Sequence, residues 1–427
     1  MKHLVLSLLA ILFSATNVCA QLTLERCQQL AQENYPAIKK YGLIDKSLEI
    51  ELSDINKTWL PSVAVYGQGT IQNIVPAFPA ALEDVLAQMG REVRGIGKFQ
   101  YKIGVDISQT IWDGGASNAR REIVRSQDAV QQSGLDVEMY ALRQKVDNIY
   151  FAILLTEEQI KQSNQTLDLL NANLDILRSR LENGTAMRSD VDMVLAEALT
   201  LKQAIAQAES AVKSYRTLLS IYVGEDISSQ ILVLPTPDLP ANLTSDRPEL
   251  KLFDSSQNAL ETSQLMTNVS LMPKIGFFAQ AYYGYPGFDY FKSMMNRDLS
   301  FNIMAGVRVS WNIDSFYTKK NKLAKTALDI DNINIERETF LFNSRLQTES
   351  QLETLEGLRN VMQDDAQIIE LRGNVRKAAE SQLRNGIIDA TALLSKITDE
   401  NLARLTAKFH EIQYIQEVYK IKNTLNR

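Results

Sequence analysis

The chain has 427 residues and a formal net charge of −6, from 45 Lys and Arg against 51 Asp and Glu. This acidic balance offers no basic surface for nucleic acid. Hydrophobic residues make up 45% of the chain, which argues against a disordered or collagen-like protein. Two Cys and two His are too few for a closed structural zinc site. We therefore expect a folded protein with no metal, no other cofactor and no nucleic acid partner.

The first twenty residues have the pattern of a signal peptide. Lys2 precedes an apolar run over 4–13, and small residues before Ala20 suit cleavage after that position. Lipidation of Cys19 is the less favoured alternative, because the residues before it lack the usual Leu and small residue. Cleavage would leave Cys27 as the only cysteine, so no internal disulfide can form. The sequence suggests no role for Cys27 beyond packing.

Two long stretches without proline, 80–234 and 287–427, are where long helices can run. Within 167–181 the leucines step by three and four residues, which is the spacing of a coiled-coil seam. Apolar residues in 191–222 keep the same spacing. The pattern predicts a hairpin of two long antiparallel helices, over about 116–222, that pack on each other in coiled-coil fashion.

The second half of the chain repeats the plan of the first. The sequence around Asn183 and Gly184 returns around Asn385 and Gly386, and a Gly-Val-x-x-Ser segment that begins at Gly104 returns at the same spacing. We therefore expect a two-fold internal repeat. The predicted parts are a first repeat over 21–224, a Pro-rich linker over 225–247 and a second repeat over 248–427, with its own coiled hairpin at about 316–425.

Each half also carries two segments in which apolar and polar residues alternate, as in strands with one apolar and one wet face. Their length, about ten to fifteen residues, suits a tilted strand that crosses a membrane. A soluble antiparallel sheet is the alternative. The expected strands cover about 62–72, 99–112, 274–285 and 299–313, and the aromatic residues expected at the membrane interface are Phe99, Tyr101, Tyr285 and Trp311.

Four strands cannot close a barrel, and an open sheet edge cannot lie in lipid because its backbone groups would have no partners. A membrane barrel would therefore be shared between subunits. Two chains would supply eight strands, and three would supply twelve with room for a water-filled lumen. The residues alone favour an oligomer and leave its number open.

A cleaved signal, a duplicated helix-strand-strand-helix unit, proline-free hairpins and the two Leu-x-Asn-Gly tips together resemble the TolC-like outer membrane efflux proteins. The resemblance implies an α+β fold and a homotrimer, with a twelve-stranded barrel in the outer membrane lipid and a helical tunnel in the periplasm. It implies a passive pore and no enzyme: the exit duct of an efflux or type I secretion-like export system. The pore would open by docking to a periplasmic adaptor that serves an inner membrane RND or ABC pump. The alternative is a periplasmic coiled-coil scaffold or adaptor without a pore.

The resemblance extends to the hairpin tips only in part. Asp190 matches the aspartate that the family places six residues after the first tip glycine. After the second tip glycine the family has an arginine and two aspartates, where this chain has Ile388, Ala392 and Ser395. We therefore expect a closed end held by hydrophobic contacts of Ile387 and Ile388, with Asp190 and Asp389 as its charged components. The residues expected to dock the adaptor are Asn183, Gly184, Thr185, Asn385 and Gly386. The simpler explanation of the two Asn-Gly pairs is that they are helix caps alone.

Overall fold

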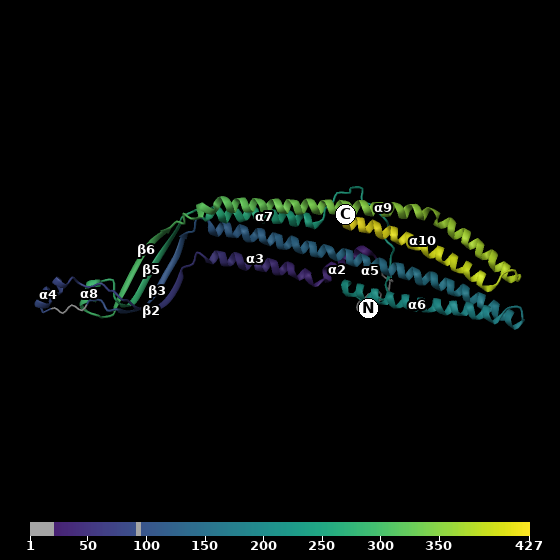
Figure 1. The fold of residues 1–427 in the computed structure, drawn as a ribbon, viewed down its shortest axis with the longest axis horizontal. Helices are drawn as coiled ribbons and strands as arrows, with labels where there is room; N and C mark the ends of the chain where they lie inside the picture. The colour runs from purple at the N-terminus through teal and green to yellow at the C-terminus, as the bar shows by residue number, and fades with distance from the viewer. Residues whose placement is uncertain (1–20, 91–94) are drawn as a thin grey trace, which may run out of the picture. The chain divides into compact units, whose positions relative to one another are not determined.

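The computed structural model describes residues 21–90 and 95–427, and the predicted signal peptide lies outside these ranges. Long helices dominate the structure (Figure 1). No helix in the described ranges combines the length and the apolarity needed to cross a membrane. The elements in chain order are β1 (Gln21–Leu22), α2 (Leu24–Asn34), η1 (Pro36–Ile38), α3 (Lys39–Lys57), β2 (Ser62–Ile71), α4 (Ala80–Gln88), β3 (Phe99–Trp112), α5 (Ala116–Glu182), α6 (Arg188–Val223), β4 (Ile231–Leu232), α7 (Pro248–Val269), β5 (Lys274–Tyr285), α8 (Tyr290–Met295), β6 (Ser300–Ser310), α9 (Ser315–Arg384) and α10 (Ala390–Leu425).

The chain divides into two compact units. The helical unit comprises the described residues of 1–41 together with 132–252 and 335–427, and the sheet unit comprises those of 42–131 together with 253–334. The helical unit contains both hairpin tips. The sheet unit contains the four long strands.

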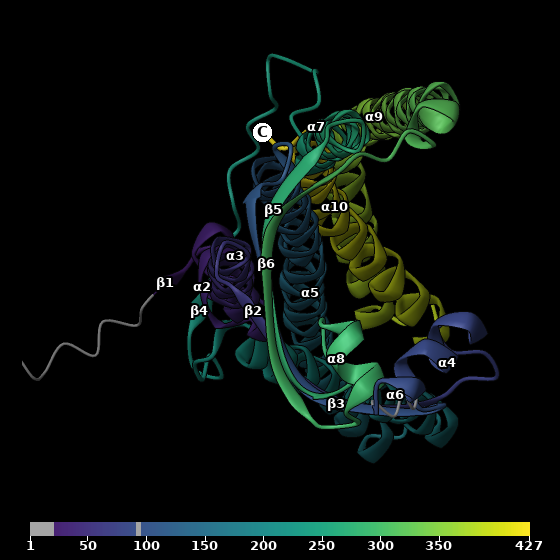
Figure 2. The ribbon, with the colours of Figure 1, turned by 90° about the vertical axis from the view of Figure 1, so that its left-hand side faces the viewer.

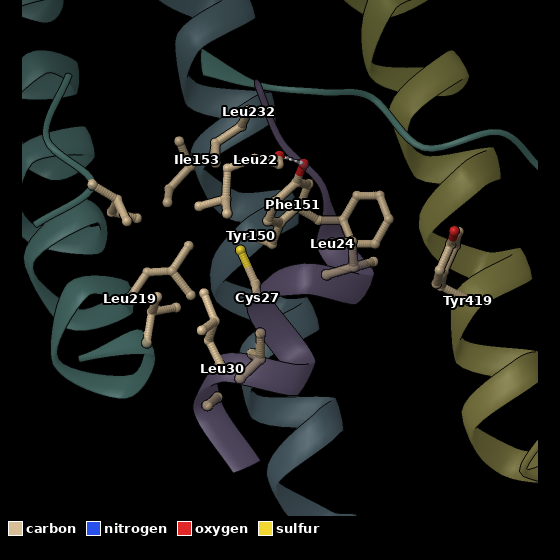
Figure 3. Close-up of a cluster of buried hydrophobic side chains, with 14 of the residues drawn as sticks. Leu22, Leu24, Cys27, Leu30, Tyr150, Phe151, Ile153, Leu219, Leu232 and Tyr419 are labelled. Atoms are coloured by element: carbon tan, nitrogen blue, oxygen red, sulfur yellow. Dashed lines mark hydrogen bonds between the residues drawn. The ribbon is translucent and has the colours of Figure 1, made fainter. Parts of the chain in front are cut away.

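The central core of the helical unit forms where the short helix α2 packs on α5, α6 and α10 (Figure 3). The Thr23 side chain begins α2 by accepting a hydrogen bond from the Arg26 N–H at 3.3 Å. Cys27 lies on the apolar face of α2 and is fully buried. Burial, with the charges of Glu25 and Asp147, raises the pKa of the Cys27 thiol to about 12, so this thiol is an inert packing group.

The predicted linker over 225–247 contains a short strand that joins the core. β4 pairs in parallel with β1, with Leu22 opposite Leu232. The Tyr150 hydroxyl of α5 lies 2.8 Å from the Leu22 carbonyl oxygen and accepts a hydrogen bond from the Val233 N–H at 3.0 Å. One buried hydroxyl therefore ties the first residues of the described chain and the segment between the halves to the same helix.

A second core joins the two hairpins near their tips. In Figure 1, α6 runs back along α5 and α10 runs back along α9. The prediction that each hairpin packs on itself was incomplete, because one cluster takes buried side chains from all four helices. Its buried members are Leu170, Leu174, Leu177, Val191, Val194, Ala198, Ala379, Leu383, Ala390, Leu393 and Ile397. The apolar stripes are broad enough to cover more than one neighbour.

The sheet unit is built on an antiparallel sheet with the strand order β2-β3-β5-β6. The strands curve together (Figure 2). Val65 lies opposite Val105, Val105 opposite Ala281, and Ala281 opposite Ile303. Because side chains alternate along a strand, this register places the apolar positions of all four strands on one face. The strand predicted over 299–313 is shorter in the structure, and Trp311 follows its last residue.

Candidate functional site

The two hairpin tips turn in the same way. Gly184 and Gly386 adopt φ values of +68° and +73°, which glycine tolerates without strain. The Thr185 N–H donates to the Arg180 carbonyl at 2.8 Å, and the Ile387 N–H donates to the Gln382 carbonyl at 2.9 Å. Both bonds close the last turn of a helix in the manner of a C-terminal cap.

The tip asparagines extend the same caps. The Asn183 amide donates to the Ser179 carbonyl at 2.8 Å, and the Asn385 amide donates to the Ser381 carbonyl at 3.0 Å. The cap explanation of the Asn-Gly pairs is therefore correct. A role of these exposed residues in docking stays a prediction.

Both predicted gate aspartates lie at the starts of helices. Asp389 is the N-cap of α10, and its carboxylate accepts from the Ala392 N–H at 2.8 Å. The carboxylate of Asp190, in the first turn of α6, accepts from the Met187 N–H at 3.1 Å. Each negative charge is favourable at the positive end of a helix dipole. The two aspartates thus have a structural role, and their role in a gate stays a prediction.

The two tip isoleucines differ in their surroundings. Ile388 is half-buried and packs against the core that joins the hairpins. The Ile387 side chain is 70% exposed. Ile387 is therefore the residue free to contact another molecule, and Ile388 already contributes to the packing of its own chain.

Arg180, which sequence reasoning missed, connects the two hairpins. From the last turn of α5, its guanidinium donates to the Leu383 carbonyl at 2.6 Å and also to the Arg384 carbonyl. These carbonyls belong to the last turn of α9, where carbonyl groups lack partners from a following helical turn. The Leu383 carbonyl also accepts from the Gly386 N–H at 3.0 Å. A basic residue at a helix C-terminus is a visible sequence signal. That Arg180 donates to the terminal carbonyls of a neighbouring helix is visible only in the structure.

A second polar group, the buried carboxylate of Glu400, lies deeper between the helices. Glu400 on α10 is 5% exposed, and its carboxylate accepts from Arg404 at 2.7 Å and from Arg376 of α9. Burial opposes ionisation of Glu400, but the hydrogen bonds and charges of the two arginines outweigh burial and lower its pKa. Removal of one partner would leave a buried charge uncompensated.

The sheet has one apolar and one polar face, and the apolar face is the more exposed. Val65, Ile103 and Ile303 of the apolar face are 74%, 61% and 64% exposed. On the other face Tyr282 and Asn302 are 6% and 9% exposed. A soluble sheet covers its apolar face with a core, so the structure disfavours that alternative. An uncovered apolar surface of this kind is typical of contact with lipid or another protein.

Three of the four predicted interface aromatics are exposed. Phe99 and Tyr101, at the start of β3, are 58% and 44% exposed, and their ring centroids lie 5.6 Å apart. Trp311 is 56% exposed and donates its indole N–H to the Leu271 carbonyl at 2.9 Å. An apolar ring with a satisfied polar group suits a membrane interface.

Tyr285 differs from the prediction. Its ring is 4% exposed, and it packs with Ile96 and Met294 under the segments that follow the strands. The Tyr285 hydroxyl accepts from the Gly97 N–H at 2.7 Å and lies 3.3 Å from the Ser293 carbonyl oxygen. Alternation alone cannot show this burial, because the covering residues lie outside the strand, Ile96 before β3 and Met294 in α8. Tyr285 packs inside a small core of residues from the loops between the strands. In this conformation it cannot belong to an exposed ring of aromatic residues at the membrane interface.

Residues 53–225 match the family described as outer membrane efflux protein. No curated protein matches the sequence. Within the described residues, no group of three or more His, Cys, Asp or Glu side chains could hold a metal ion.

Several solved structures share the fold over nearly the whole chain. The outer membrane protein VceC from Vibrio cholerae has a TM-score of 0.68 at 10% identity, with 94% of this chain and 95% of that chain covered. The MtrE outer membrane channel of Neisseria gonorrhoeae, in its open state, has a TM-score of 0.67 at 14% identity, with 94% and 88% covered. The CmeC outer membrane channel of Campylobacter jejuni has a TM-score of 0.65 at 13% identity, with 94% and 85% covered. The family match and the shared fold confirm the resemblance predicted from the sequence, that of this chain to the TolC-like outer membrane efflux proteins.

Proposed function

We propose that the protein is a passive exit duct of the outer membrane, in which three chains share one twelve-stranded barrel. The observation that carries this proposal is the exposed apolar face of the four-stranded sheet, opposite a face that bears polar and charged side chains. Lipid on one face and water on the other is the arrangement of a membrane barrel strand. The family match and the shared fold support the proposal.

The edges of the sheet argue for an assembly of several chains. β2 and β6 are its outer strands, and within the described residues neither has a second neighbour. Unpaired backbone groups are not tolerated in lipid, so each edge needs a strand from another chain. Eight strands from two chains would enclose an interior filled by side chains, whereas twelve from three leave a lumen. A duct therefore favours the trimer.

The helical unit supports the same assembly. On α9 the apolar residues Val361, Ile368 and Val375 recur every seven positions, and they are 48%, 44% and 47% exposed. A repeat of seven residues is the pattern of a coiled-coil seam. Within the described part of the chain this seam remains exposed, so a second copy of the chain is its natural partner.

The hairpin tips are the proposed gate and docking surface. Ile387, Asp190 and Asp389 would line the closed end of the pore, while Ile388 supports it from within the hairpin core. A periplasmic adaptor would contact the exposed Asn-Gly tips and open the pore. An inner membrane pump of the RND or ABC class would supply the energy, and the duct itself would catalyse no reaction.

Conductance in a planar lipid bilayer tests this function. The full chain, purified in detergent, should insert and give discrete openings, which truncation of Ile387 to Ala should make longer or more frequent. The duct would be overturned, and the periplasmic scaffold favoured, if both the unaltered chain and Ile387→Ala fold but never insert or conduct.

A further inference from the structure

The charged residues of the four long strands all lie on the polar face of the sheet. They are Lys102 and Asp106 of β3, Lys274 of β5 and Arg308 of β6. The strand register places these residues on the same face, because Asp106 lies opposite Gln280 and Arg308 lies opposite Gly276. Three cations against one carboxylate make this face positive, although the chain as a whole carries −6. The local field thus favours anions where the chain average would predict cations.

A cavity of about 240 Å³ opens beside Lys102. Pockets for drug-sized molecules span roughly 300–1,000 Å³, so this one suits a single substituted ring or one part of a larger molecule. Its lining includes the amides of Gln68 and Gln100 and the rings of Tyr282 and Tyr290. Lys102 is the only charged residue in the described lining. The cavity therefore combines one positive charge, hydrogen-bonding amides and aromatic rings.

Aromatic rings hold the Lys102 ammonium in place. Its Nζ lies 5.6 Å from the ring centroid of Tyr66 and 5.2 Å from that of Tyr282, which is the range of cation–π contact. The carboxylate of Asp106, four residues further along β3, is engaged elsewhere, since it accepts from the Gln280 amide at 2.8 Å. The same amide lies 3.0 Å from the Tyr66 hydroxyl. Within the described residues Lys102 forms no ion pair. Its charge is half-buried and available to an anion.

From this arrangement we propose that the polar face of the sheet contains a binding subsite for small aromatic carboxylates, with Lys102 as the residue that selects the anion. The carboxylate would contact the ammonium, the glutamine amides would donate to its oxygens, and the tyrosine rings would contact its ring. The proposal rests on the exit-duct function, in which this face lines the path of the cargo. The subsite would make small aromatic carboxylates the chemical class of the cargo.

Three probes of similar size test the subsite: benzoate, benzylammonium and neutral benzamide. Calorimetric titration of the unaltered full chain in detergent should show benzoate binding at least tenfold more tightly than either of the others. Lys102→Met should weaken benzoate binding at least tenfold, whereas Lys102→Arg should retain most of it. Arg308→Met is the matched control, because it removes the same charge from the same face outside the cavity lining, and it should leave the affinity unchanged.

The outcomes separate this inference from the exit-duct proposal. Equal binding of benzylammonium and benzoate, or unchanged benzoate binding by Lys102→Met, would overturn the subsite. A chain that conducts in the bilayer but binds no benzoate would also overturn it, and the duct would stand. Benzoate binding by a chain that never conducts would overturn only the duct. If Lys102→Met fails to fold, the three probes on the unaltered chain decide the question.

Discussion

The hairpin tips and the sheet bury their apolar residues in different ways. At the tips, leucines of four helices cover one another inside a single chain, so that Leu174 is 4% exposed. On the sheet, Ile303 is 64% exposed, because nothing in the described chain covers its face. The first region holds its fold by its own packing, whereas in the proposed duct the second would be covered by lipid and joined by neighbouring chains. The difference shows that apolar character alone does not mark a core.

The largest effect is expected from truncation of the core between the hairpins. Leu174→Ala should lower the free energy of unfolding by about 2–5 kcal/mol, through lost apolar burial and the cavity left behind. Denaturant unfolding of the detergent-purified chain, followed by circular dichroism, measures it. Ile387→Ala, at the exposed tip, is the control and should change the value by no more than about 0.5 kcal/mol. Equal effects of the two would contradict the packing described here.

A charge on the apolar face of the sheet should block membrane assembly. Ile303→Arg places a cation where lipid is proposed, at a cost of about 2–4 kcal/mol per chain near the bilayer midplane. Its neighbour on β6, Met304, points to the polar face, so Met304→Arg is the matched control. Liposome insertion should fall strongly for Ile303→Arg and little for Met304→Arg. If both variants insert equally well, the apolar face does not meet lipid.

Asp147 makes the stability of the helical unit depend on pH. Burial raises the pKa of its carboxyl to about 6, against the opposing hydrogen bonds from Gln28 and Asn423. A raised folded-state pKa means that the unfolded state releases its proton first. The contribution to stability is therefore complete below about pH 4 and is lost as the pH rises through 6. The rise of the Asp147 pKa from 3.8 to about 6 corresponds to a loss of about 3 kcal/mol in the free energy of unfolding across this pH range.

Asp147→Asn should flatten this pH dependence, because the amide does not titrate. The variant keeps only one acceptor oxygen for the two donors, Gln28 and Asn423. The unfolding midpoint, measured between pH 4 and 8, should fall with rising pH more steeply in the unaltered chain than in the variant. Asp175→Asn is the control, because Asp175 lies on the same helix with a side chain that is 77% exposed. Parallel curves for the unaltered chain and Asp147→Asn would show that another group carries the dependence.

The sequence predicted regular structure well and side-chain partners poorly. The alternation in 274–285 defined β5, because each position faces either water or an apolar surface. The same alternation placed Tyr285 among exposed aromatics, but Ile96, far away in sequence, and Met294 of the nearby helix α8 cover it. Asp190 was identified through the family resemblance, whereas its bond to the Met187 N–H required the fold. Local periodicity is thus readable from one strand or helix, and contacts between elements are not.

Arg180 gives the smallest expected effect and the most direct test of how the tips are held. Its guanidinium supplies hydrogen bonds to the Leu383 and Arg384 carbonyls at the end of α9, and a bond to a charged group contributes about 1.5–3 kcal/mol. Arg180→Met keeps the apolar stem, so it should destabilise the tips by about this amount and raise the resting conductance of the pore. Arg180→Lys retains the charge but loses the two-armed geometry of the guanidinium. Its stability and its conductance should lie between those of the unaltered chain and those of Arg180→Met. Unchanged conductance and stability in Arg180→Met would show that apolar packing alone joins the hairpins.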